Sequence, residues 1–137
     1  MRRLVFAALA VLGPATFAFA GDVTVRVSGM KDSVGQIRVA ACTEAEFLKT
    51  CMLVASAPAR LGSLDVRIGT VPPGRYAIQA FQDRDGDGAL ARNLLGIPTE
   101  PFGLSRSPAM RFGPPAFADA ALGIDSRSII VPVALRL

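Results

Sequence analysis

The segment VPPGRYAIQAFQDRDGDG, residues 71–88, contains a turn, a strand and an acidic loop in direct succession. Its two prolines and first glycine are typical turn residues, because proline fixes φ and has no N–H to donate. Residues 75–82 follow with a two-residue alternation that places Tyr76, Ile78 and Ala80 on one face. This alternation predicts a β-strand with one buried face, followed at once by a cluster of carboxylates.

The acidic loop at residues 83–88 has aspartates at alternate positions and ends in glycine. Carboxylate oxygens in this pattern suit a hard cation such as Ca²⁺, and the run matches the first half of an EF-hand loop. The twelfth position is Leu94 instead of a bidentate glutamate, and the preceding element reads as a strand, so the loop is not an EF-hand. The sequence predicts a weak calcium site with ligands drawn from Asp83, Asp85, Asp87, Ala89, Asn93 and Glu100.

Two alternatives remain open for these acidic residues. Asp and Gly are common in turns, so the loop can also be an exposed, solvated turn without a metal. Paired carboxylates perform glycoside hydrolysis, which would make the protein a carboxylate-based hydrolase acting on an envelope or extracellular glycan. The chain has no histidine, the usual general base near neutral pH, and we find no catalytic constellation in it. A non-catalytic protein is therefore the preferred interpretation.

Residues 1–20 have the organisation of a secretory signal peptide. Two arginines precede an apolar run that is shorter than the ~20 residues needed to span a bilayer. Ala18-Phe19-Ala20 fits the small-residue cleavage signal, so we expect the mature chain to begin at Gly21 and to be periplasmic or secreted. No later apolar run is long enough to span a membrane. Residues 21–137 are predicted to form a single domain.

Charge and cysteine content narrow the classes of partner and site. Without Arg2 and Arg3 the formal charge falls from +4 to +2. The remaining basic residues are scattered singly, which argues against nucleic acid as a partner. Cys42 and Cys51 are the only cysteines, and an even pair in an exported chain predicts a structural disulfide. A redox or metal role is disfavoured, because the spacing is not C-x-x-C and two thiols without histidine make a poor metal site.

The rest of the chain is rich in short strands separated by turns. We expect residues 22–28 and 35–41 to pair as a hairpin, and Thr43 and Glu46 to form the capping box of a single helical turn. Residues 117–122 are ambiguous, with an edge strand as the expectation. The remaining predicted strands are 52–59, 64–69, 75–82 and 128–137, the last at a sheet edge because Pro132 cannot donate to a ladder.

This pattern of six to seven short strands predicts an all-β protein folded as a single β-sandwich. Residues 89–116 have no periodicity and are punctuated by proline and glycine, so we expect one long loop there. The apolar residues of this segment argue against disorder and predict that the loop packs over one end or face of the sandwich, as a structural cover or a binding surface. They are Leu94, Leu95, Ile97, Phe102, Leu104, Met110 and Phe112.

Four motifs follow one another in an order that resembles a known family: PPGRYAI, FQDRDGDG, NLLGIPTEPFGLS and GPPAFADA. The first is similar to a turn-and-strand pattern of transthyretin-like and related immunoglobulin-like β-sandwich modules. The whole set resembles the bacterial family labelled domain of unknown function 2141, over nearly the entire mature chain. The resemblance implies an exported β-sandwich protein, and it implies no activity, substrate or catalytic residue.

These observations predict an exported, non-catalytic binding or structural module of the bacterial cell envelope with a weak calcium site. The hydrolase remains the alternative. The partner is expected to be an envelope protein or a glycan, and the sequence does not choose between them.

Overall fold

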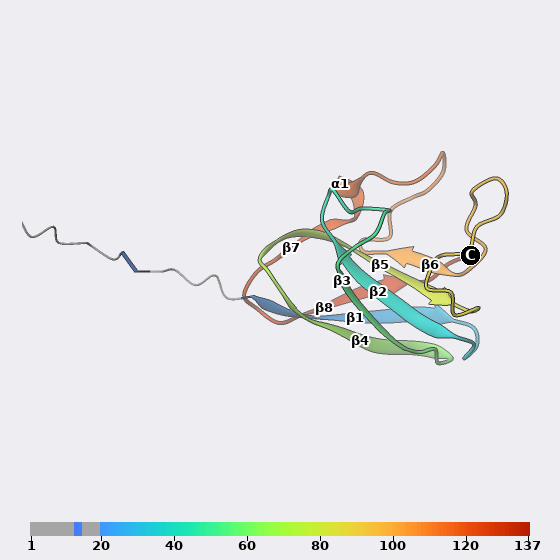
Figure 1. Cartoon of the computed structure of the whole chain (residues 1–137), viewed down its shortest axis with the longest axis horizontal. Coiled ribbons are helices and arrows are strands. Elements are labelled where there is room, and N and C mark those ends of the chain that lie inside the picture. Colours follow the sequence, from blue (N-terminus) through green and yellow to red (C-terminus); the bar gives the residue numbers. More distant parts are fainter. Residues whose placement is uncertain (1–12, 15–19) are drawn as a thin grey trace, which may run out of the picture.

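The computed structural model describes residues 13–14 and 20–137. The predicted signal peptide, residues 1–20, lies almost entirely outside these residues and stays a prediction. In the described residues, eight strands form two sheets, of three and five strands, and one short helix lies outside the sheets (Figure 1). Within the described part of the chain, no helix is long and apolar enough to cross a membrane.

The smaller sheet has the strand order β4-β1-β8. Its central strand β1 (Gly21–Met30) is antiparallel to β4 (Gly62–Val71) and parallel to β8 (Ile129–Ala134). The position of β8 at the edge confirms the expectation from Pro132, because a missing N–H is tolerated where no further strand pairs.

The larger sheet has the strand order β3-β2-β5-β6, and β7 also pairs with β5. The segment predicted at 75–82 is therefore a central strand with partners on both sides. A single-turn helix precedes β7. The bounds are β2 Gln36–Cys42, β3 Leu53–Pro58, β5 Gly74–Asp83, β6 Phe102–Leu104, α1 Phe117–Ala120 and β7 Ala121–Ile124.

The core lies between the inner faces of the two sheets, and the alternation in the sequence is its burial pattern. Val23, Val25 and Val27 of β1 are fully buried, as is Ile78 of β5. Removing these side chains from water stabilises the fold by ~25 cal/mol per Å² of apolar surface. The predicted all-β sandwich is confirmed. A second apolar cluster around Phe117 packs α1 on the larger sheet, outside the main core.

The predicted hairpin between residues 22–28 and 35–41 is wrong. These segments are β1 and β2, which belong to different sheets: β1 pairs with β4 and β8, whereas β2 pairs with β3 and β5. Each strand has one apolar face, and the two faces meet across the core instead of the two edges meeting in a ladder. An alternating pattern shows which face is buried, but it does not choose the neighbouring strand.

Within the described residues the structure has eight strands rather than six or seven, because β6 forms where proline and glycine obscure the pattern. β6 lies inside the segment predicted as one loop. Residues 117–122 are not a single edge strand: their first four form α1 and the rest begin β7. Backbone and side-chain hydrogen bonds between Ala116 and Asp119 close the helical turn.

The long segment 89–116 is packed only in part. Leu104 of β6 is buried, but Leu94 and Phe112 are fully exposed. On either side of β6 the chain makes an excursion that projects away from the sheets (Figure 1). The first excursion is closed at its base by a bridge between Arg92 and Pro98, which turns the intervening residues outward. The prediction of a packed loop therefore holds for β6 and is wrong for Leu94 and Phe112.

Gly35 lies where β2 begins and where its backbone contacts the end of β5. Its φ is +75°, and a Cβ at this position would overlap the carbonyl oxygen of Asp83. Gly62 is a matched control, because its φ is also positive, at +94°, but no atom lies within 4 Å of the position of a Cβ.

We predict that Gly35→Ala destabilises the protein more than Gly62→Ala. A positive φ costs an L-residue ~1–2 kcal/mol at both sites. The overlap at Gly35 adds a steric cost of ~1–3 kcal/mol. Free energies of unfolding from urea denaturation measure the difference. Equal losses would show that Asp83 does not pack on Gly35 as described.

Candidate functional site

The candidate site begins at Asp83, the last residue of β5, whose side chain is fully buried. Its carboxylate accepts three hydrogen bonds: from Nε of Arg38 at 2.5 Å, from the Gly86 N–H at 3.0 Å and from the Gly88 N–H at 2.9 Å. Burial acts most strongly on the pKa of Asp83 and raises it, but the Arg38 guanidinium and the Gly88 N–H outweigh burial and lower the pKa below its ordinary value. Asp83 is therefore an ionised carboxylate held in place by one arginine and two backbone N–H groups.

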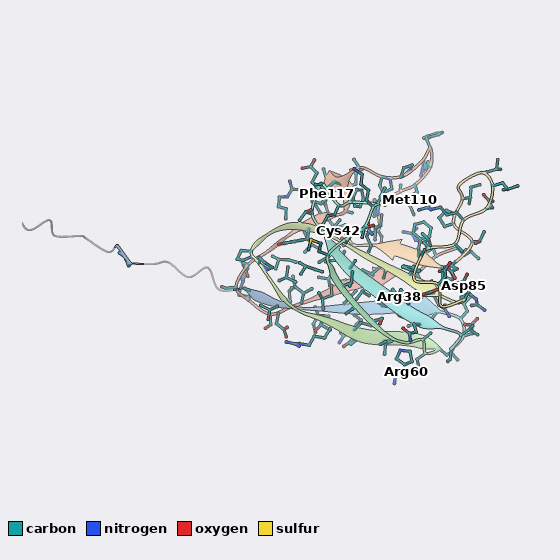
Figure 2. All side chains as sticks on the ribbon, in the orientation of Figure 1. Arg38, Cys42, Arg60, Asp85, Met110 and Phe117 are labelled. Carbon is teal, nitrogen blue, oxygen red and sulfur yellow. A yellow bond between two sulfur atoms is a disulfide. The ribbon has the colours of Figure 1, made fainter. Side chains whose placement is uncertain are left out.

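Arg38 comes from β2, the strand next to β5 in the sheet. Its neighbours Ile37 and Val39 face the core, so the pleat directs Arg38 to the outer face of the sheet. The guanidinium reaches along that face to Asp83, and the arginine side chain remains 35% exposed. Figure 2 shows Arg38 on β2 and Asp85 in the loop beyond β5, toward the same end of the larger sheet.

The other two aspartates of the loop are exposed. An Asp85 side-chain oxygen accepts the Asp87 N–H at 3.2 Å, and Asp87 in turn accepts the Ala89 N–H at 2.9 Å. One oxygen each of Asp83, Asp85 and Asp87 lies within 4.8 Å of the others. The Asp87 N–H has the largest influence on the pKa of Asp85 and lowers it, but desolvation and the neighbouring carboxyls of Asp83 and Asp87 together raise it. The loop thus holds three carboxyl groups close enough to repel one another when they are ionised.

Glu100 and Asn93 do not join this cluster. Glu100 is buried, and its two oxygens accept the backbone N–H of Arg84 at 2.9 Å and of Ala91 at 3.0 Å. The Asn93 amide oxygen accepts the N–H groups of Leu95 and Ile97 and so organises the first exposed excursion. Of the predicted ligands, the structure brings together the three aspartates. Glu100 instead links Arg84, near the start of the acidic loop, to Ala91, three residues after its end.

Asp32 holds the same loop from the connection between β1 and β2. It accepts a hydrogen bond from Arg84 at 2.7 Å and one from the buried side chain of Gln82 at 2.8 Å. Asp32 also accepts the Val34 N–H. The Arg84 guanidinium has the largest effect on the pKa of Asp32, followed by the Val34 N–H and the Gln82 side chain, and together they lower it to about 2. The acidic loop is therefore held by the connection between β1 and β2 as well as by β5.

A disulfide joins Cys42, at the end of β2, to Cys51, just before β3, with the Cα atoms 5.2 Å apart. Residues 44–48 between them form turns rather than a helix. Glu46 accepts the Thr43 N–H at 2.9 Å, which is the contact expected of the capping box, and its other oxygen accepts the Met52 N–H at 3.2 Å. The disulfide and Glu46 both fix the connection from β2 to β3.

The geometry gives the acidic residues unequal chemistry. Asp83 and Glu100 are buried and their oxygens accept backbone or arginine N–H groups, so neither presents a free carboxyl to a substrate. A glycoside hydrolase needs two carboxyls on opposite sides of a substrate bond. Asp85 and Asp87 instead share one exposed turn, where their oxygens can meet a cation or water.

Arg38 and Asp32 were missed in the sequence. Their positions relative to the loop depend on which strands pair, which one strand's alternation does not reveal. One signal was present: Arg38 interrupts an apolar run at the position that must face outward from the sheet. A buried Asp83 needs a cationic partner, and the outward arginine of a neighbouring strand is the natural donor.

A family model described as an uncharacterized protein conserved in bacteria (DUF2141) matches residues 25–131. No curated protein matches the chain. No solved structure matches it either.

We predict that Asp83→Asn and Asp85→Asn have opposite consequences when no divalent cation is present. Asp83→Asn leaves Arg38 without its charge partner, and water can hydrate only part of the guanidinium. The expected cost is about 2–4 kcal/mol of unfolding free energy. Asp85→Asn removes an exposed charge from a repulsive cluster, so stability should stay level or rise. Denaturant unfolding in the presence of chelator measures both, and a larger loss for Asp85→Asn would refute this division of roles.

Proposed function

The chain belongs to the bacterial family DUF2141, and from this premise we propose that it is an exported, non-catalytic binding or structural module of the cell envelope whose acidic loop binds calcium weakly. The observation that carries the calcium proposal is the convergence of oxygens from Asp83, Asp85 and Asp87 within 4.8 Å. Calcium accepts six to eight oxygen ligands in flexible geometry, so three carboxylates with water can begin such a shell.

The way the loop is built supports this proposal. Gly86 and Gly88 have positive φ angles of 74° and 80°, and their N–H groups are fixed on Asp83. The backbone therefore wraps around one carboxylate and holds the next two close to it. Repulsion among these charges raises the free energy of the empty loop, and a divalent cation would relieve it. With few charged ligands and open solvent, the expected affinity is that of extracellular modules, ~10⁻⁴–10⁻³ M.

Two observations support placement in the envelope. The disulfide between Cys42 and Cys51 is a feature of proteins that mature in an oxidising compartment, which in bacteria is the periplasm or beyond. The N-terminal residues have the order of charge, apolar run and small-residue cleavage signal that directs export. An envelope protein or a glycan is the class of partner that such a module would meet.

The export proposal predicts the mass of the mature protein. Protein recovered from the periplasm should begin at Gly21, and it should be two hydrogen atoms lighter than the same chain after reduction, because Cys42 and Cys51 are joined. Intact-mass measurement with and without reductant, together with N-terminal sequencing, reads out both features. Recovery of an uncleaved chain with free thiols would contradict export.

The calcium proposal predicts a higher melting temperature in calcium than in chelator at constant ionic strength. Calcium at ten times its dissociation constant adds ~1.4 kcal/mol of stability by mass action. Magnesium should do much less, because it dehydrates reluctantly and demands tighter octahedral geometry. Asp85→Asn should reduce the calcium shift, whereas Glu44→Gln, which removes an exposed acid from the connection between β2 and β3, should not.

Two results would end the calcium proposal. Identical melting curves for the wild-type protein in calcium and in chelator would show that the loop is a solvated turn. A calcium shift that Glu44→Gln reduces as much as Asp85→Asn would show general charge screening instead of a site.

A further inference from the structure

A groove of about 770 Å³ lies on the outer face of the larger sheet. This volume is within the ~300–1,000 Å³ typical of small-molecule sites. Loop residues 48–51, which include one cysteine of the disulfide, contribute to its lining, as do Gly88 at the end of the acidic loop and Ala89, Leu90 and Arg92 after it. No element of the described chain fills this space, and the acidic loop's outward aspartates are not among its lining residues.

The floor of the groove is built from two adjacent rows of side chains that cross the sheet. Strand register sets the first row across β3, β2, β5 and β6, and the second row runs beside it. The first row places a cation next to two aromatic rings, and the second is mainly apolar with one small residue in its middle. The rows are Ser56, Arg38, Phe81 and Phe102, and Val54, Ala40, Gln79 and Leu104.

The charge of the groove has one sign. Three of its lining residues are cationic, Arg38, Lys49 and Arg92, and none is acidic. Asp83 compensates Arg38 from the side, whereas Lys49 and Arg92 form no salt bridge with any described residue. An apolar floor with an excess of positive charge is complementary to a molecule with an apolar body and an anionic head.

Arg38 is the group that can fix such a head. Its Nε is held by the buried Asp83, but Nη1 and Nη2 donate no hydrogen bond to any described residue. The ion pair therefore holds the guanidinium while its other donors remain free on the groove side. Guanidinium and carboxylate match geometrically in two parallel hydrogen bonds, which makes a planar carboxylate the best-fitting anion.

We propose that this groove binds a small amphipathic carboxylate, with its head on the free Nη groups of Arg38 and its apolar body along Phe81, Phe102 and the space above Ala40. The groove adjoins the aspartate cluster through the Arg38–Asp83 ion pair, but no residue of the cluster lines it. The groove proposal agrees with the proposed function in describing a binding module. It does not require that the acidic loop bind calcium.

Decanoate titrated into the full mature protein, in chelator, tests the proposal by calorimetry. Decanoate should bind, while acetate and 1-decanol should bind at least about tenfold more weakly, because each lacks one half of the recognition. Decyl phosphate distinguishes the head group: binding equal to or tighter than that of decanoate would overturn the carboxylate assignment. No binding of decanoate, or equal binding of 1-decanol, would overturn the site as a whole.

Variants locate the binding. Ala40→Phe fills the floor without touching the ion pair and should weaken decanoate at least about tenfold. The double variant Arg38→Gln with Asp83→Asn removes both charges, avoids a buried unpaired carboxylate and should abolish binding. Arg26→Gln is the matched control, because Arg26 is paired with Asp65 on the smaller sheet.

An unchanged affinity in Ala40→Phe, or an equal loss in Arg26→Gln, would contradict this location. Because chelator is present throughout, a failure of the calcium proposal leaves these results unaffected. A failure here likewise leaves the calcium melts unaffected.

Discussion

The candidate site depends on the buried carboxylate of Asp83. An ionised group removed from water costs several kcal/mol unless charge and hydrogen bonds replace its hydration. Arg38 supplies the charge from the adjacent strand, and the N–H groups of Gly86 and Gly88 supply hydrogen bonds from the loop. The hydrogen bonds that the Asp83 carboxylate accepts therefore position the acidic loop on one side of it and Arg38 on the other. The tight contact at Gly35 leaves the end of β5 little room to move.

Two different surfaces meet at this ion pair. The loop side presents Asp85 and Asp87 to solvent, while the sheet side presents the free Nη groups of Arg38 to a groove with no acidic lining residue. The negative and the positive surface are thus joined through a single carboxylate. In the calcium state that we propose, the cation and Arg38 would share the charge of Asp83, so the loop and the groove would be linked electrostatically.

Much of the fold follows from local patterns in the sequence. The alternation of Val23, Val25 and Val27 predicted a buried face, and the single pair of cysteines, Cys42 and Cys51, in a chain with an export signal predicted the disulfide. The partner of each strand did not follow, because alternation fixes the face and leaves the neighbour open. That limit explains both the incorrect hairpin and the absence of Arg38 from the predicted site.

The acidic loop shows the same limit at the level of single residues. The spacing of its three aspartates predicted that they would lie together, and all three do. The sequence did not show that Asp83 is buried or that Glu100 accepts two backbone N–H groups, since both depend on the surrounding strands. Carboxylates of equal appearance in the sequence therefore have unequal roles in the fold.

A double-mutant cycle between Arg38 and Asp83 tests the central claim most directly. Unfolding free energies of Arg38→Gln, Asp83→Asn and the double variant give the coupling between the two side chains. We predict a coupling of ~1–3 kcal/mol, with the double variant losing less than the sum of the single losses, because it leaves no uncompensated buried charge. Losses that add within ~0.5 kcal/mol would contradict the claim that this ion pair holds the loop and the groove in place.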